Sequence, residues 1–172
     1  MDTVDKAKAA MGGFERFISN LPGIKGYREK ELRREADKQV RDTLARALEK
    51  RRSTITALQG ELLSAGGLLW LDDIERVVGR LQLLIDRIKT AAYGYAGFFD
   101  AQRIKEAELE RLAQFDQALF EELPKLDEAI AGLEKAVQAN EGLKEAIKAV
   151  GDLLAGLNET FGRRIEILRG AE

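Results

Sequence analysis

The chain has 172 residues, 45% of them hydrophobic and 34% charged, with a formal net charge of −2. This length fits one domain with its own core, and the near-neutral charge gives no general attraction to nucleic acid or membranes. The absence of cysteine and histidine excludes disulfides and thiolate chemistry, and it removes the usual general base at neutral pH.

Residues 3–20 predict a short amphipathic helix, because their apolar side chains recur at steps of three and four. Gly12 and Gly13 weaken this helix by about 1 kcal/mol each relative to alanine. Pro22 and Gly23 suit the turn that ends it. We therefore separate an N-terminal amphipathic segment and turn, residues 1–24, from a helical bundle, residues 25–172.

Four further segments carry stripes of apolar residues at helical spacing, which predict long amphipathic helices. They are residues 28–63, 69–92, 101–139 and 142–168. The second has the densest stripe, which includes Leu81 and Ile88, so we place it at the centre. Short connections favour antiparallel neighbours. The predicted fold is all-α: an up-down-up-down, antiparallel bundle of about four helices with coiled-coil-like seams, plus a short N-terminal helix.

Pro124 lies inside the third segment and predicts a kink or a split near Glu122, because proline removes a backbone hydrogen bond. The first and third helices would each be about 55 Å long and the second about 36 Å, so the long ones should overhang it. Leu32, Ala36 and Val40 lie on the overhanging part of the first helix. Covering that stripe requires residues 1–24 or a second copy, and we expect a homodimer or a larger homo-oligomer.

The segment between the second and third helices holds four aromatic residues and two glycines within residues 93–100. One interpretation is an aromatic pocket or a tip that docks a partner. The other is a plug that closes the end of the bundle beside Trp70 or Phe120. The plug is the simpler interpretation, because it needs no ligand.

At this segment the motif YGYAGFFDA, together with LPGIKGY and the Arg/Glu-rich start of the first long helix, resembles an uncharacterised family of small bacterial helical proteins. The resemblance covers about residues 14–137 and implies a helical fold but no activity and no functional residues. A fainter similarity to membrane remodellers of the phage-shock-protein-A type rests on a short amphipathic segment before a long charged helix. The second helix here is too short for the long hairpin of that family.

Charge is unevenly distributed along the chain. Residues 25–52 hold 11 Lys and Arg against 6 Asp and Glu, whereas residues 100–172 hold 10 against 16. A basic helix suits nucleic acid, an acidic partner or anionic lipid, but it can equally pack beside acidic helices of the same chain. Acids interrupt every basic cluster and no aromatics are interleaved for base stacking, so we expect no specific nucleic-acid binding.

Nothing in the sequence points to catalysis. The pairs Asp72–Asp73 and Glu121–Glu122 are adjacent, so their side chains point to different sides of a helix. No glycine-rich loop matches a phosphate-binding pattern. The start of the chain is unlike a signal peptide, and the longest uncharged runs have ten residues, where a membrane-spanning helix needs about 20. We expect a cytoplasmic protein that is not an enzyme and that has no cofactor or metal.

The expected function is a non-enzymatic scaffold or interaction protein that acts through apolar helix seams, with another protein or a second copy as partner. Two alternatives stay open: a peripheral membrane-associated protein that uses the N-terminal amphipathic helix, and a helical bundle that binds a small ligand. The candidate interaction residues are the exposed apolar and aromatic ones of the loop, the N-terminal segment and the overhang: Tyr93, Tyr95, Phe98, Phe99, Phe14, Phe17, Ile18, Leu32 and Val40.

Overall fold

The computed structural model describes the backbone of residues 30–91 and 106–170, and the side chains of residues 38–91 and 114–166. These residues form four long helices and one 3-10 helix, with no strand among them: α2 (Lys30–Ser64), η2 (Leu68–Trp70), α3 (Leu71–Thr90), α4 (Glu106–Ala139) and α5 (Leu143–Gly170). The all-α prediction is confirmed. The predicted N-terminal helix lies outside the described residues.

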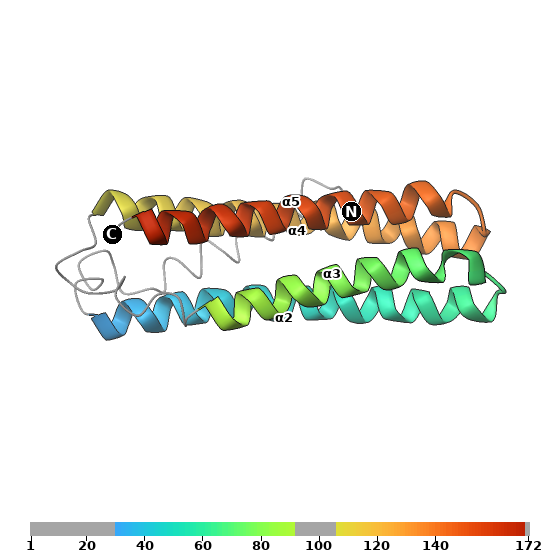
Figure 1. The fold of residues 1–172 in the computed structure, drawn as a ribbon, viewed down its shortest axis with the longest axis horizontal. Coiled ribbons are helices and arrows are strands. Elements are labelled where there is room, and N and C mark those ends of the chain that lie inside the picture. Colours follow the sequence, from blue (N-terminus) through green and yellow to red (C-terminus); the bar gives the residue numbers. More distant parts are fainter. Residues whose placement is uncertain (1–29, 92–105, 171–172) are drawn as a thin grey trace.

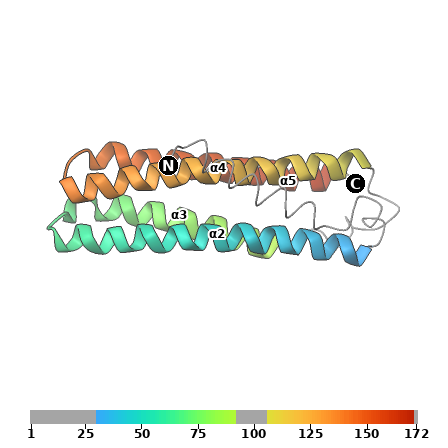
Figure 2. The same ribbon diagram turned by 180° about the vertical axis from the view of Figure 1, so that it is seen from behind.

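The four helices form two antiparallel hairpins that lie side by side, α2–α3 and α4–α5 (Figure 1). Between the hairpins, α2 packs against α4 and α3 against α5. Both hairpin turns lie at the same end of the bundle, as the view from behind also shows (Figure 2). The chain direction therefore alternates as predicted, but neighbours from different hairpins run parallel, not antiparallel.

One apolar core is shared by all four helices. The stripe predicted to be central is buried in α3 along its whole length: Ile74, Val77, Leu81, Leu84, Ile85 and Ile88. Leucines of the other helices pack against it, including Leu48, Leu126 and Leu154. Each buried leucine contributes about 1.5–3 kcal/mol, so packing of the apolar faces holds these helices together.

Of the kink or split predicted at Pro124, the split is wrong, because α4 runs without interruption from Glu106 to Ala139, and the kink stays a prediction. Proline in a helix interior costs about 3 kcal/mol. Leu123 and Leu126, on either side of Pro124, are buried in the core. The free energy gained by burying these two leucines is about as large as the cost of the proline in the helix. Tertiary packing therefore keeps the helix continuous.

The long helices extend beyond α3 at the end away from the turns, as expected for 35 and 34 residues against 20 (Figure 1). Val40, which was predicted to lie on the overhanging part of the first helix, is only 8% exposed. The next residue, Arg41, donates a hydrogen bond to the carbonyl of Ile88 in the last turns of α3. Val40 is therefore still level with α3, and the overhang begins nearer the start of α2.

Candidate interaction site

The turn after α2 is closed by two backbone hydrogen bonds in the Schellman arrangement. The Gly67 N–H donates to the Leu62 carbonyl at 2.9 Å, and the Gly66 N–H donates to the Leu63 carbonyl at 3.2 Å. Gly66 has a φ of +81°, which glycine adopts without steric cost. At Gly67 a Cβ atom would lie 2.6 Å from Cγ of Leu62. The backbone conformation therefore favours glycine at position 66, and close packing against Leu62 favours it at position 67.

The 3-10 helix η2 follows directly and exposes two leucines. The Trp70 N–H donates to the Gly67 carbonyl at 3.1 Å, and with three residues per turn only one side chain of η2 faces the core. That side chain is Trp70, which is half-buried and packs against the core. Leu68 and Leu69 are 67% and 80% exposed, and Leu63 before the turn is 52% exposed. We call Leu63, Leu68 and Leu69 the apolar tip.

Carboxylates flank the apolar tip in the sequence. Others lie at the neighbouring turn, at the same end of the bundle. We define the acidic rim as six residues of α2, α3 and the neighbouring α4–α5 turn: Glu61, Asp72, Asp73, Glu75, Glu141 and Glu145. Residues 61–76 and 138–145 contain only two cations, Arg76 and Lys144. Arg76 pairs with Asp73 at 3.3 Å on the surface. Asp72 and Asp73 also offset the helix dipole in the first turn of α3.

A second polar cluster is buried toward the opposite end of the bundle. Arg164 is 1% exposed, and its Nε donates to Oδ1 of Asp116 at 2.6 Å, which joins α5 to α4. Arg41 in α2 donates to the carbonyls of Ile88 and Lys89 at 3.2 and 3.3 Å, which joins α2 to α3. Each hairpin thus has a buried arginine near its open end.

These buried arginines have a structural explanation. Arg164 lies against a carboxylate, and Arg41 lies against the C-terminal carbonyls of α3, where the helix dipole is negative. Counted from the turns at 1.5 Å per residue, both arginines lie about 33–35 Å along the bundle. Buried ion pairs such as Asp116–Arg164 add little net stability, and in some proteins they fix which helices pair and in which register. We therefore assign this cluster to the specification of the fold.

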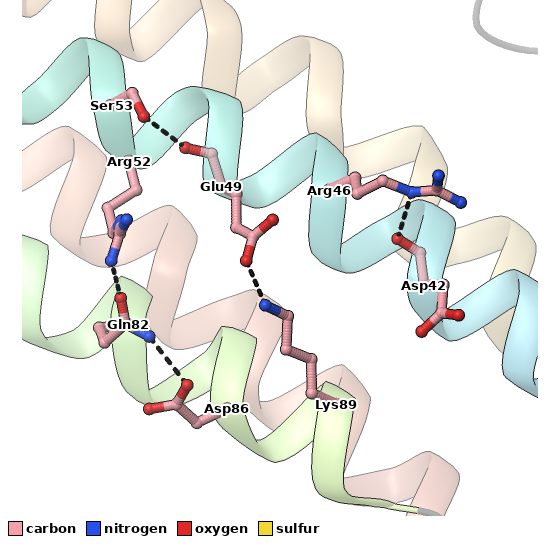
Figure 3. Close-up of polar contacts among 8 residues, drawn as sticks. All are labelled: Asp42, Arg46, Glu49, Arg52, Ser53, Gln82, Asp86 and Lys89. Atoms are coloured by element: carbon pink, nitrogen blue, oxygen red, sulfur yellow. Dashed lines mark hydrogen bonds and ion pairs between the residues drawn. The ribbon is translucent and has the colours of Figure 1, made fainter.

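A third set of polar contacts runs along the surface between α2 and α3 (Figure 3). Arg52 donates to Gln82, which in turn donates to Asp86 at 2.8 Å, and Lys89 pairs with Glu49. Figure 3 shows these contacts as two bridges from one helix to the other. Exposed pairs of this type contribute about 0–1 kcal/mol each, so they help to align the hairpin without defining a binding site.

The basic stretch of α2 is also contacted by α4. Arg51 pairs with Asp127 at 2.6 Å and donates to the Ala47 carbonyl at 2.8 Å. Arg51 is only 15% exposed at its side chain, whereas Asp127 is 53% exposed. This contact agrees with the interpretation in which the basic helix packs beside acidic ones of the same chain.

The adjacent carboxylates considered for catalysis do not converge. Glu122 pairs with Lys125 at 2.5 Å, while Glu121 accepts a hydrogen bond from Gln117 at 2.7 Å. Asp73 pairs with Arg76, while Asp72 is exposed. Among the side chains that the structure describes, those of residues 38–91 and 114–166, no group of three or more acidic, histidine or cysteine residues is placed to hold a metal ion.

Most of the predicted interaction residues lie outside the part of the chain that the structure describes, so their role stays a prediction. Tyr93, Tyr95, Phe98, Phe99, Phe14, Phe17 and Ile18 lie outside the described residues. Leu32 lies in α2, but its side chain is outside the described part, and Val40 is buried.

Sequence reasoning missed the apolar tip. A signal was present: the run LLWL follows a double glycine, and a helical start cannot turn four consecutive apolar side chains to one core. Elsewhere in the described part of the chain the one other large, exposed apolar side chain is Leu83, on α3.

Comparisons of the chain with protein-family models, with curated proteins and with solved structures find no match. The family resemblance of the aromatic segment therefore stays a prediction. Function has to be argued from the geometry of the chain itself.

Proposed function

We propose that this is a non-enzymatic interaction protein, in which a stiff helical bundle presents the apolar tip to a partner. The observation that carries the proposal is the exposure of Leu68 and Leu69 on a turn that backbone hydrogen bonds hold in place. The apolar seams expected to act as contact surfaces are buried within one chain from Val40 onward in α2. The apolar tip therefore takes their place in the proposal.

The size of the apolar tip favours a reversible contact. Its three leucines together expose the equivalent of roughly two whole leucine side chains, and burying them would contribute about 3–6 kcal/mol. Association costs about 4–15 kcal/mol. The leucines alone do not hold a tight complex, so the partner must also contact the residues around them.

The membrane-associated alternative has less support. No helix in the described part of the chain is both long and apolar enough to cross a bilayer. Peripheral contact through the exposed leucines would bring the acidic rim against lipid headgroups, which is unfavourable where the lipids are anionic. The ligand-binding alternative depends on the aromatic segment, which lies outside the described residues. A cytoplasmic location and self-association remain part of the proposal.

The proposal is tested by site-specific photo-cross-linking in the cells that produce the protein. A photoreactive amino acid replaces Leu69 in one variant and Leu83, a matched exposed leucine away from the turn, in the other. We expect a discrete cross-linked protein from position 69 and none from position 83. The captured protein, once purified, must bind the wild-type chain and must lose that binding when Leu68 and Leu69 become serine. Equal cross-linking at both positions, or none at 69, would contradict the proposal.

A further inference from the structure

The acidic rim indicates what kind of partner fits the apolar tip. We infer that the tip binds a cationic amphipathic segment of another protein, which rests apolar side chains on the leucines and sets Lys or Arg against the rim. This inference rests on the proposed function and adds the chemistry of the partner. It is carried by the combination of exposed leucines with the six carboxylates and two cations of residues 61–76 and 138–145.

The rim carboxylates come from both hairpins, so the proposed binding surface spans the two hairpin turns. Glu61 lies in the last turn of α2 and Glu75 near the start of α3, whereas Glu141 and Glu145 belong to the neighbouring turn and the start of α5. All four side chains are exposed. Packed helices lie about 8–10 Å apart, so a ligand of a few helical turns reaches from one hairpin turn to the other.

Charge complementarity separates this partner from the other occupants. Two copies meeting tip to tip would bring their acidic rims together, and like charges at an interface are unfavourable. Anionic lipid and nucleic acid are repelled for the same reason. A cationic segment is attracted, and the attraction should weaken with salt because the rim is exposed.

Trp70 provides an internal reporter for this surface. It is the only tryptophan of the chain, it directly follows Leu69, and it is half-buried against the core. Covering the leucines removes water from around the indole ring. The emission of the full chain should therefore shift to shorter wavelength when the tip is occupied.

The experiment adds tryptophan-free peptides to the full-length protein and follows Trp70 emission. The first peptide is an amphipathic Leu/Lys helix of about 14 residues, about 21 Å long. The second is a matched Leu/Glu helix, and the third is a scrambled Leu/Lys peptide with no apolar face. We expect a saturable blue shift with the first peptide only, reduced at high salt. Changing Leu68 and Leu69 to serine should weaken binding at least about tenfold, whereas Leu83→Ser should not.

A charge variant separates the inference from the proposed function. Changing Glu61, Glu75 and Glu141 to glutamine should weaken binding of the Leu/Lys peptide by about tenfold. The helical circular dichroism spectrum of the protein should not change. If the Leu/Lys and Leu/Glu peptides bind equally through Leu68 and Leu69, the tip is an interaction site, but its preference for a cationic partner is refuted. A blue shift with anionic vesicles, or with protein concentration alone, would replace the inference by membrane contact or self-association. No shift with any probe would overturn the inference and leave cross-linking to decide the proposed function.

Discussion

The two hairpin turns lie at the same end of the bundle and close their first helices in the same way, but they present different surfaces. After α4, the Glu141 N–H donates to the Ala136 carbonyl at 3.1 Å and the Asn140 N–H to the Val137 carbonyl at 3.3 Å, the same pairing as after α2. α5 then begins at once with Leu143, which is 4% exposed. The α2–α3 turn instead inserts η2 and exposes two leucines.

This difference shows that a hairpin turn at this end of the bundle can be closed without exposed leucines. The α4–α5 turn connects its helices with the polar run Asn140, Glu141 and Gly142, and its next leucine enters the core. In the α2–α3 turn only Trp70 enters the core. The side chains of Leu68 and Leu69 stay in water, at positions where polar residues connect the other hairpin. Exposed apolar side chains that lie together in this way are typical of an interaction site.

The largest expected effect concerns the open ends of the two hairpins. Asp116→Asn removes the carboxylate charge that pairs with the buried Arg164, which should destabilise the protein by about 3–5 kcal/mol. Arg41→Met removes the hydrogen bonds to the carbonyls of Ile88 and Lys89, and we expect it to destabilise the protein by about 1–3 kcal/mol. Urea unfolding followed by circular dichroism measures both. Equal losses would mean that the two arginines stabilise their hairpins in the same way.

The next prediction compares one leucine from each turn. Leu143→Ala should destabilise the protein by about 2–5 kcal/mol, because Leu143 is buried in the core. Leu69→Ala should change stability by less than about 0.5 kcal/mol, because its side chain is in water. Thermal melts of the two variants give the comparison directly. A large loss for Leu69→Ala would show that this leucine is covered in solution.

The third prediction concerns the glycines of the two turns. Gly67→Ala places a Cβ against the side chain and carbonyl of Leu62, which should cost about 1–3 kcal/mol through overpacking. Gly142→Ala meets no atom within 4 Å, and only its φ of +69° opposes the change, at about 1–2 kcal/mol. A shift in Trp70 emission should accompany Gly67→Ala and be absent in Gly142→Ala, because only the first moves the start of η2.

The all-α fold could be predicted because apolar spacing reports directly on which face of a helix is buried. Leu81 and Ile88 were expected at the centre and are fully buried. Pairing of the hairpins could not be predicted in the same way, because the stripe of a helix does not say which two neighbours it meets. The buried pair Asp116–Arg164 was missed for a related reason: its residues are 48 positions apart and look like ordinary surface charges in the sequence.

The apolar tip lies apart from the residues that were predicted to make contacts, most of which are outside the described part of the chain. The prediction relied on aromatic residues and on an apolar stripe of the overhanging first helix. Val40, on that stripe, is buried because α2 is still level with the last turn of α3 at that point. Leu69 was predicted to start the next helix, with Leu68 just before it. Whether a leucine at a helix start faces in or out depends on the turn before it, and a 3-10 turn rotates side chains differently from an α-helical one.

The smallest expected effect comes from exchanging the residues that close the two turns. Asn140 has a φ of +50° and Gly66 a φ of +81°, and both donate the same hydrogen bond of the Schellman arrangement. Asparagine tolerates this conformation less well than glycine, although glycine loses more entropy on folding, so the two terms partly cancel. We expect Asn140→Gly to stabilise the protein by about 0.5 kcal/mol and Gly66→Asn to destabilise it by slightly more. For a chain of this length these changes move the melting temperature by about 1–2 °C in opposite directions. If Asn140→Gly lowers the melting temperature instead, the Asn140 side chain contributes to the polar turn, and the two turns differ in how they are held as well as in what they expose.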